Sequence, residues 1–177
     1  IRAALERASV EPGQVDYVIM GNVLSAGLGQ APARQAAMGA GIPDTCSALT
    51  VNKVCASGMM AAVLGILMVR SGDADIVVAG GMESMSRAPH VLPDSRRGRR
   101  IGDWALVDTM VHDGLWCCFN DTHMGNLAEG TATSFEINRE AQDRFALSSH
   151  QKAVRVAADG GFREDIAAVT VEGRKGA

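Results

Sequence analysis

The sequence has few aromatic residues and little excess charge of either sign. Phe, Trp and Tyr make up 4% of the 177 residues, and the formal net charge is −3. Nucleic-acid-binding domains are usually basic, so nucleic acid is not expected as a partner. No apolar run reaches the roughly 18 charge-free residues of a membrane-spanning helix, so no membrane partner is expected either.

The sequence also lacks the cysteine spacings of a metal site or a disulfide framework. Its four cysteines form no Cys-x-x-Cys pair, and no histidine pair lies at ligand spacing, which argues against a zinc site. Cys117 and Cys118 are neighbours, a poor arrangement for a structural disulfide. We therefore expect no metal and a reduced, intracellular protein.

The chain has no initiator methionine and begins directly in a helical pattern, and it stops just after a strand-like run. We therefore expect an incomplete chain, a piece of a longer protein. Its hydrophobic fraction of 47% is enough to form a buried core. No targeting segment is visible, so a cytoplasmic location is the default expectation.

The first half of the chain alternates between helical and strand-like patterns. The strand-like segments are short, nearly continuous apolar runs, which are typical of buried strands. Residues 55–70 are apolar on nearly all sides, which predicts a fully buried helix, and Gly72 fits its C-terminal cap. This alternation predicts an α/β layered fold with helices packed on a sheet. The expected elements are helices over 1–9, 33–41 and 55–70 and strands over 15–23, 47–52 and 76–79.

From about residue 85 onward the sequence has the composition of loops. Long loops in compact proteins usually cover a functional site. The basic run at 96–100 is interpreted as a solvated loop or an oligomer contact. The expected elements are a short helix over 104–110, an irregular segment over 112–130, a long helix from the N-cap Asn138 to about residue 159, and a strand over 166–171.

Cys55 lies where a predicted strand ends and a predicted helix begins. The first amides of a helix have no intrahelical partner, and the helix dipole is positive there. A thiolate at that position is stabilised, and the thiolate is the nucleophilic form of cysteine. The small neighbours Ala56, Ser57 and Gly58 leave room for a substrate, and the amides there could bind an oxyanion. Cys55 is therefore a candidate nucleophile.

Two other interpretations of the cysteines stay open from the residues alone. Cys55 could be an inert cysteine under the helix cap, because no general base lies nearby in the sequence. Cys46 lies in a segment, residues 44–49, that resembles the nucleophile turn of ketoacyl synthases. A strand rather than a helix follows Cys46, so we interpret it as structural.

Several segments, taken together, resemble the thiolases over nearly the whole chain. They are GNVLSAGLGQAPARQAA at 21–37, TVNKVCASGM at 50–59, GDADIVVAGGMESMSRAPH at 72–90, GDWALVDTMVHDGL at 102–115, HMG at 123–125, EINREAQDRFALSSHQKA at 136–153 and GRKG at 173–176. The resemblance implies a thiolase-like layered fold. Residues 1–84 would be the core of the N-terminal domain, without its first strand, and residues 85–177 would be a loop domain that covers bound coenzyme A.

The resemblance also implies roles for individual residues. Cys55 would carry the acyl group, and Leu115, His123 and Met124 would line the pocket for a short acyl chain and the pantetheine arm. The sequence departs from the family at residues 127–130, where Leu-Ala-Glu-Gly replaces Thr-Ala-Glu-Asn, and at the bulky residues 116–118. Both departures lie near the expected pocket wall and bear on acyl chain length.

The activity implied by the resemblance is that of an acyltransferase of the acetyl-CoA C-acetyltransferase type. It condenses two acetyl-CoA molecules to acetoacetyl-CoA and CoA, or runs the reverse thiolysis, through an acetyl-cysteine. Coenzyme A thioesters would be the substrates, with no bound cofactor, in a homodimer or homotetramer that serves fatty acid metabolism. The family's NEAF-type Asn, GHP-type His and second Cys do not occur in the 177 residues, so a C-terminal domain is expected elsewhere and this chain alone is expected to be inactive.

Three alternatives remain. The protein could be a longer-chain 3-ketoacyl-CoA thiolase, which differs in pocket depth. It could be a decarboxylating ketoacyl synthase, for which Cys46 rather than Cys55 would react with iodoacetamide. It could also be a truncated, non-catalytic thiolase-like module that serves assembly or binding.

Overall fold

The computed structural model describes residues 1–170, in which the chain forms two compact units. Unit 1 is Ile1–Met124 and unit 2 begins at Gly125. The sequence predicts a boundary between residues 84 and 85, where the sheet ends. The contacts instead join residues 85–124 to the sheet, so this loop-rich segment is part of unit 1.

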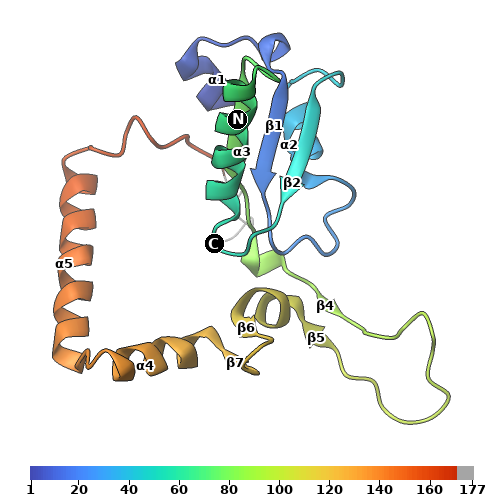
Figure 1. Ribbon diagram of the computed structural model, residues 1–177, viewed down its shortest axis with the longest axis vertical. Coiled ribbons are helices and arrows are strands. Elements are labelled where there is room, and N and C mark those ends of the chain that lie inside the picture. Colours follow the sequence, from blue (N-terminus) through green and yellow to red (C-terminus); the bar gives the residue numbers. More distant parts are fainter. Residues whose placement is uncertain (171–177) are drawn as a thin grey trace, which may run out of the picture. The chain divides into compact units, whose positions relative to one another are not determined.

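Unit 1 is built on a three-stranded parallel sheet. Its strands are β1 (Tyr17–Gly21), β2 (Ser47–Val51) and β3 (Val77–Gly81), in the order β2-β1-β3 (Figure 1). The central strand β1 pairs in parallel with both neighbours. Helix α2 (Pro32–Gly39) connects β1 to β2, and helix α3 (Ser57–Ser71) connects β2 to β3. The predicted α/β fold, with helices packed on a sheet, is confirmed.

The two connecting helices cover opposite faces of the sheet, as Figure 1 shows. Crossovers between parallel strands are right-handed, and these two run in opposite directions along the sheet, so the helices lie on different faces. Val18 and Met20 of β1 belong to the buried cluster on the α2 side, together with Ala33 and Ala37 of α2. Gly21 has the other strand parity and faces α3.

Helix α3 packs on the sheet through a stripe of small residues. Its buried positions are Ser57, Ala61 and Gly65, which are spaced four residues apart and therefore lie on one face. A Cβ added at Gly65 would lie 3.1 Å from Cγ1 of Val77, so helix and sheet approach closely there. Gly72 ends the helix in the left-handed conformation, as predicted.

The outer face of α3 is exposed, which corrects the expectation of a helix buried all round. Met59 and Ile66 are 73% and 58% exposed. The segment Val54–Ser71 is also long and apolar enough, by length and composition alone, to cross a membrane, which the sequence analysis did not expect. The small residues of the inner face are explained by close packing on the sheet.

Helix α1 (Arg2–Ala8) and the 3₁₀ helix η1 (Pro12–Gln14) precede the sheet. Asp16 then links the starts of β1 and β3. Its Oδ2 accepts hydrogen bonds from the backbone amides of Ile76, at 2.9 Å, and Asp75, at 2.8 Å. These two amides lower the pKa of Asp16, because they favour the ionised carboxylate.

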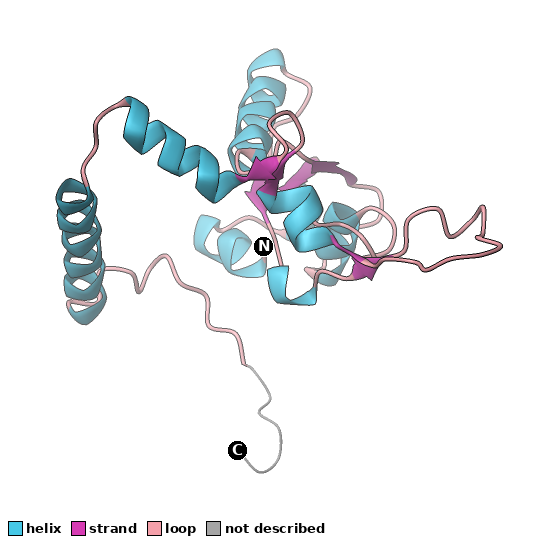
Figure 2. Ribbon diagram, turned by 90° about the horizontal axis from the view of Figure 1, so that it is seen from below, coloured by secondary structure: helices cyan, strands magenta, loops and turns pink. Residues whose placement is uncertain are grey.

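Residues 85–124 form short elements. They are η2 (Met85–Arg87), β4 (His90–Val91), β5 (Val107–Asp108), the π-helical segment η3 (Met110–Leu115), β6 (Trp116–Cys117) and β7 (Thr122–His123). β4 pairs antiparallel with β5, and β6 with β7. Residues 92–106 between β4 and β5 form an extended loop without helix or strand (Figure 2), so the predicted loop at the basic run 96–100 is confirmed.

The predicted helix over 104–110 is wrong. The chain forms β5 there, and the helical segment η3 begins only at Met110. The side chain of Asp108 explains the later start, because its Oδ1 accepts a hydrogen bond from the Met110 amide at 2.9 Å. A short polar side chain that accepts such a bond favours the beginning of a helix.

Two helices account for most of the remaining chain. They are α4 (Met124–Ser134), whose first residue ends unit 1, and α5 (Arg139–Ala158). The predicted irregular segment over 112–130 is therefore wrong, because it includes most of η3 and the start of α4. The helix after Asn138 is confirmed, and the Asn138 side chain accepts a hydrogen bond from the Ala141 amide at 2.9 Å. Residues 166–170 hold no strand, and the GRKG segment lies outside the described residues.

Candidate active site

The loops that follow β1, β2 and β3 meet at one edge of the sheet, because parallel strands have their carboxyl ends on the same side. Ligands of open α/β folds bind at this edge. A cavity of about 410 Å³ lies there. Its lining residues are mostly apolar or glycine: Gly21, Val23, Leu24, Val54, Cys55, Ser57, Gly58, Gly81, Met82, Glu83, Met85, Gly114 and Leu115. Such walls suit an apolar group.

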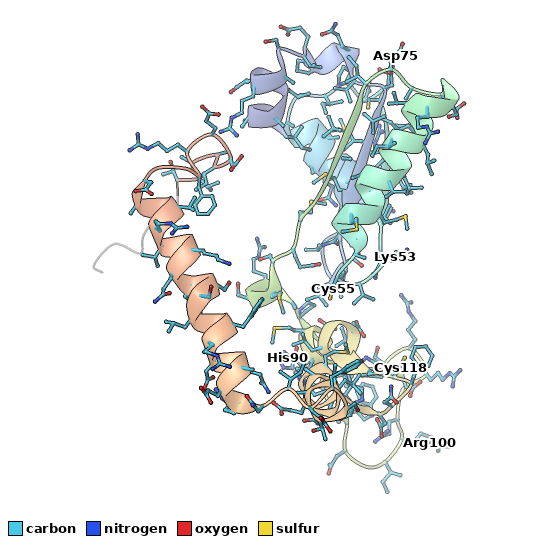
Figure 3. All side chains as sticks on the ribbon, turned by 60° about the vertical axis from the view of Figure 1, so that its left-hand side comes forward. Lys53, Cys55, Asp75, His90, Arg100 and Cys118 are labelled. Atoms are coloured by element: carbon cyan, nitrogen blue, oxygen red, sulfur yellow. The ribbon has the colours of Figure 1, made fainter. Side chains whose placement is uncertain are left out.

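Cys55 lies on a tight turn between β2 and α3, and its side chain is exposed (Figure 3). Val54 adopts φ 50°, a left-handed conformation that is uncommon for a β-branched residue. The Asn52 side chain stabilises the turn, since its Oδ1 accepts the Val54 amide at 3.0 Å. Helix α3 begins at Ser57, so Cys55 lies two residues before the helix rather than at its predicted first position.

Ser57 holds the turn together from the first position of α3. Its Oγ donates a hydrogen bond to the Val54 carbonyl at 2.6 Å and accepts one from the Lys53 amide at 2.8 Å. The amides of Ala56 and Ser57 also donate to the carbonyls of Lys53 and Val54, both at 3.1 Å. Ser57 is 5% exposed, so these bonds are shielded from water. The backbone on both sides of Cys55 is therefore fixed.

The start of α3 lies directly against the end of β1. A Cβ added at Gly21 would lie 2.6 Å from both the Gly58 nitrogen and the Ser57 carbonyl carbon, closer than real Cβ atoms approach. Gly81 of β3 approaches Gly58 as well, since its added Cβ would be 3.5 Å from the Gly58 Cα. Only glycine allows this approach at position 21, and the approach positions the Cys55 turn beside the strand ends.

Glu83 connects the strand ends on another side of the cavity. It follows β3, and its carboxylate accepts three hydrogen bonds from the loop after β1. Oε1 accepts from Asn22 Nδ2 and from the Leu24 amide, both at 3.0 Å, and Oε2 accepts from the Val23 amide at 2.9 Å. Asn22 is 3% exposed and also donates Nδ2 to the Met82 carbonyl at 3.0 Å. The loops after β1 and β3 are thus held together by side chains.

Leu24 extends this wall toward η3. Its side chain is 7% exposed, and a Cβ added at Gly114 would lie 3.3 Å from Leu24 Cδ2. Gly114 and Leu115 are the last residues of the π-helical segment, and both line the cavity. π-Helical turns are rare and are frequent at functional sites.

The structure brings together two of the four residues that the sequence proposes for the site. Cys55 and Leu115 line the cavity, whereas His123 and Met124 are not among its lining residues. His123 lies in β7, where it pairs with Trp116 of β6, and Met124 begins α4. Both side chains are exposed.

The other cysteines lie away from the cavity. Cys46 is 8% exposed, and burial raises the pKa of its thiol, which agrees with a structural role. Cys117 accepts a hydrogen bond from Asn120 Nδ2 at 3.2 Å, and this bond lowers the pKa of the Cys117 thiol. In residues 1–170, no group of three His, Cys, Asp or Glu side chains is arranged to hold a metal ion.

Comparison with known families decides the relationship. The sequence profile described as "Thiolase, N-terminal domain" matches residues 1–177, which is the whole chain. The chain belongs to the thiolase family.

Proteins named acetyl-CoA acetyltransferase are similar to this thiolase chain over nearly its whole length. The protein from Cupriavidus necator is 56% identical over 176 residues, and that from Pseudomonas aeruginosa is 52% identical over 176 residues. Each comparison covers 99% of this chain and 45% of the relative. The thiolase chain therefore spans a little under half the length of these relatives.

A solved thiolase has the same fold. The crystal structure of a thiolase from Ascaris suum in complex with coenzyme A matches this chain with a TM-score of 0.90 at 38% identity. The match covers 95% of this chain and 44% of that chain. The predicted thiolase-like fold is thereby confirmed.

Several residues that shape the thiolase cavity escaped the sequence analysis. Asn52 and Ser57 flank Cys55, and their side chains are of the type that hydrogen-bonds to nearby backbone, which was the available signal. Glu83 lies in the quoted Gly-Gly-Met-Glu run, but its partners Val23 and Leu24 are about sixty residues away in the chain. No local pattern reveals such a long-range contact.

Proposed function

We propose that this chain carries the acyl-accepting cysteine of an acetyl-CoA C-acetyltransferase, and that Cys55 is that residue. The observation that carries the proposal is an exposed thiol on a rigid turn that lines an apolar cavity at the carboxyl ends of the parallel strands. Relatives named acetyl-CoA acetyltransferase and a coenzyme A complex of a related thiolase support a coenzyme A thioester as the substrate.

In the first half-reaction, the Cys55 thiolate attacks the carbonyl carbon of acetyl-CoA. The carbon–sulfur bond to coenzyme A breaks, and coenzyme A leaves as a thiolate that takes up a proton. The acetyl group then remains on Cys55 as a new thioester. Residues such as Leu24, Met82 and Leu115 provide apolar walls beside that sulfur.

In the second half-reaction, a base removes a proton from the methyl group of another acetyl-CoA. The resulting carbanion attacks the acetyl carbon on Cys55, which releases the Cys55 thiolate and forms acetoacetyl-CoA. None of the described residues that line the cavity is a histidine, and the Glu83 oxygens already accept three hydrogen bonds. We therefore propose that the base does not belong to the cavity lining of this chain and that residues 1–177 alone do not complete the condensation.

The test is acylation of the full-length protein in which this chain occurs. Mixed with acetyl-CoA, it is expected to release about one coenzyme A per active site in a rapid burst, because acylation precedes the second half-reaction. The variant C55A is expected to lose the burst. The matched control C118A removes another exposed cysteine, outside the cavity lining, and is expected to keep it. An undiminished burst in C55A would reject the assignment.

A longer-chain 3-ketoacyl-CoA thiolase is the second candidate. The observation that favours it is the size of the cavity, since about 410 Å³ exceeds what a three-atom acetyl group fills. Rates of acylation by acetyl-CoA, butanoyl-CoA and hexanoyl-CoA separate the two functions. A fall in rate with each added pair of carbons supports the acetyl-specific enzyme, and a rise supports the longer-chain thiolase.

Oligomeric state, compartment and metabolic role stay predictions. A homodimer or homotetramer, a cytoplasmic location, independence from any bound cofactor and a role in fatty acid metabolism are all expected from the resemblance or by default. Sedimentation of the full-length protein tests the first of these most simply.

A further inference from the structure

Glu83 has contacts that its role as a surface carboxylate would not require. Its two oxygens accept hydrogen bonds from the Asn22 side chain and from the amides of Val23 and Leu24, at 2.9–3.0 Å. All three donors belong to the loop after β1, whereas Glu83 follows β3. One carboxylate therefore holds two loops of the cavity together, and both loops contribute lining residues.

The chemistry of these contacts selects a glutamate. All three partners are N–H donors, and an ionised carboxylate is acceptor-only, with two oxygens to receive them. A glutamine would replace one oxygen by an NH₂ group and turn a donor toward another donor. An aspartate is shorter by one methylene, which would draw its oxygens away from the β1 loop.

The effect of Glu83 reaches the acyl side of the cavity through Leu24. The Leu24 amide donates to Glu83 Oε1, and the Leu24 side chain packs where a Cβ on Gly114 would be 3.3 Å away. Gly114 precedes Leu115, and all three line the same cavity as Cys55. A shift of the β1 loop would therefore change the space beside the Cys55 sulfur.

We propose that Glu83 is a positioning residue that sets the acyl-chain selectivity of the cavity by holding Leu24 against the end of the π-helical segment. This inference rests on the proposed acylation of Cys55. Loss of the carboxylate releases Leu24 and enlarges the space for the acyl chain. Longer acyl groups then gain relative to acetyl.

The experiment compares wild-type full-length protein with E83Q and with the matched control E6Q. Glu6 is an exposed carboxylate of α1 and is not among the cavity lining residues, so E6Q removes the same charge without touching the wall. Second-order rates of Cys55 acylation are measured with acetyl-CoA and butanoyl-CoA, and Cys55 alkylation by iodoacetamide reports the thiol itself. E83Q is expected to shift the acetyl-to-butanoyl rate ratio by about tenfold toward butanoyl. E6Q is expected to leave the ratio unchanged.

Equal loss of both acylation rates and of alkylation in E83Q, or an unchanged ratio, would overturn the proposal, because a purely structural role gives that pattern. If E83Q does not fold, L24V decides, since it trims the same wall and keeps the carboxylate. L24V must shift the ratio in the same direction, and an unchanged ratio would overturn the proposal. Absence of Cys55 acylation in the wild-type protein would instead reject the proposed function, and the selectivity role with it.

Discussion

The sheet of unit 1 and the helices of unit 2 are stabilised in different ways. Val18 and Ile19 of β1 are completely buried between the helices on the two faces of the sheet. Within the described residues, α4 and α5 have no buried side chain, and Phe145 of α5 is 80% exposed. Local contacts stabilise α5: the Asn138 cap and the exposed i,i+4 ion pairs of Arg139 with Asp143 and Arg144 with Glu140.

This difference shows which substitutions matter for the cavity. Exposed ion pairs contribute about 0.3–0.5 kcal/mol each, so changes in α5 should be small and local. Close backbone contacts and shielded hydrogen bonds in unit 1 contribute more, and they position the Cys55 turn. Substitutions in the two units should therefore differ in size and in their effect on the thiol.

The largest effect is expected for G21A. The added Cβ would overlap the backbone of Ser57 and Gly58, which cannot move without shifting α3, so the loss of unfolding free energy should be about 3 kcal/mol. Urea denaturation of the full-length protein measures it. The control is G39A at the end of α2, where no atom lies within 4 Å of the added Cβ and a gain of about 0.5 kcal/mol is expected. Equal stability of the two variants would contradict the close packing.

A smaller effect is expected for S57A. The shielded Lys53 amide loses its hydrogen bond, which should cost about 2 kcal/mol, and the Cys55 turn should loosen. Denaturation gives the stability, and the rate of Cys55 labelling by iodoacetamide should change in parallel. S71A removes an exposed hydroxyl at the other end of α3 and should cost less than about 1 kcal/mol with no change in labelling. A change in labelling with S71A as large as with S57A would break the assignment.

In unit 2, N138A should cost about 1 kcal/mol, because the Ala141 amide loses its capping acceptor. Hydrogen exchange should accelerate in the first turn of α5 and remain unchanged in β1. N138D retains an acceptor oxygen and should restore the protection. Faster exchange in the sheet of N138A would show that the two units are not stabilised independently.

The smallest effect at neutral pH is expected for D16N, and it should show a dependence on pH. The pKa of Asp16 is lowered in the folded protein by the amides of Ile76 and Asp75, so the stabilisation by the carboxylate is present above the unfolded pKa. It is lost as the pH falls through the folded pKa, below about pH 4. Denaturation between pH 7 and pH 2.5 should show a smaller acid-induced loss for D16N than for the wild-type protein. Parallel pH curves would contradict this role.

The sequence predicted the sheet well because its signals are local. Continuous apolar runs marked β1 to β3, and Gly72 marked the end of α3, while Asn138 marked the start of α5. The outer face of α3 was misjudged because an apolar helix looks the same whether one face or all faces pack. η3 was missed because π-helical turns have no simple periodicity, and Asp108 rather than the apolar pattern determines where it begins.

The candidate site was predicted in part. The small residues after Cys55 indicated the right turn, and the resemblance to thiolases pointed to Leu115. The Glu83 contacts with the β1 loop were not predictable, because they join residues about sixty positions apart through the parallel sheet. The left-handed Val54 was not predictable either, since no β-branched residue favours that conformation.

The acyl position on the full-length protein tests the central claim most directly. After brief mixing with acetyl-CoA and acid quench, tryptic cleavage at Lys53 and Arg70 yields the peptide 54–70, in which Cys55 is the sole cysteine. We expect the acetyl group on this peptide and not on the peptides that contain Cys46 or the Cys117–Cys118 pair. An acetyl group on any of those other cysteines, with the peptide 54–70 unmodified, would contradict the assignment of Cys55.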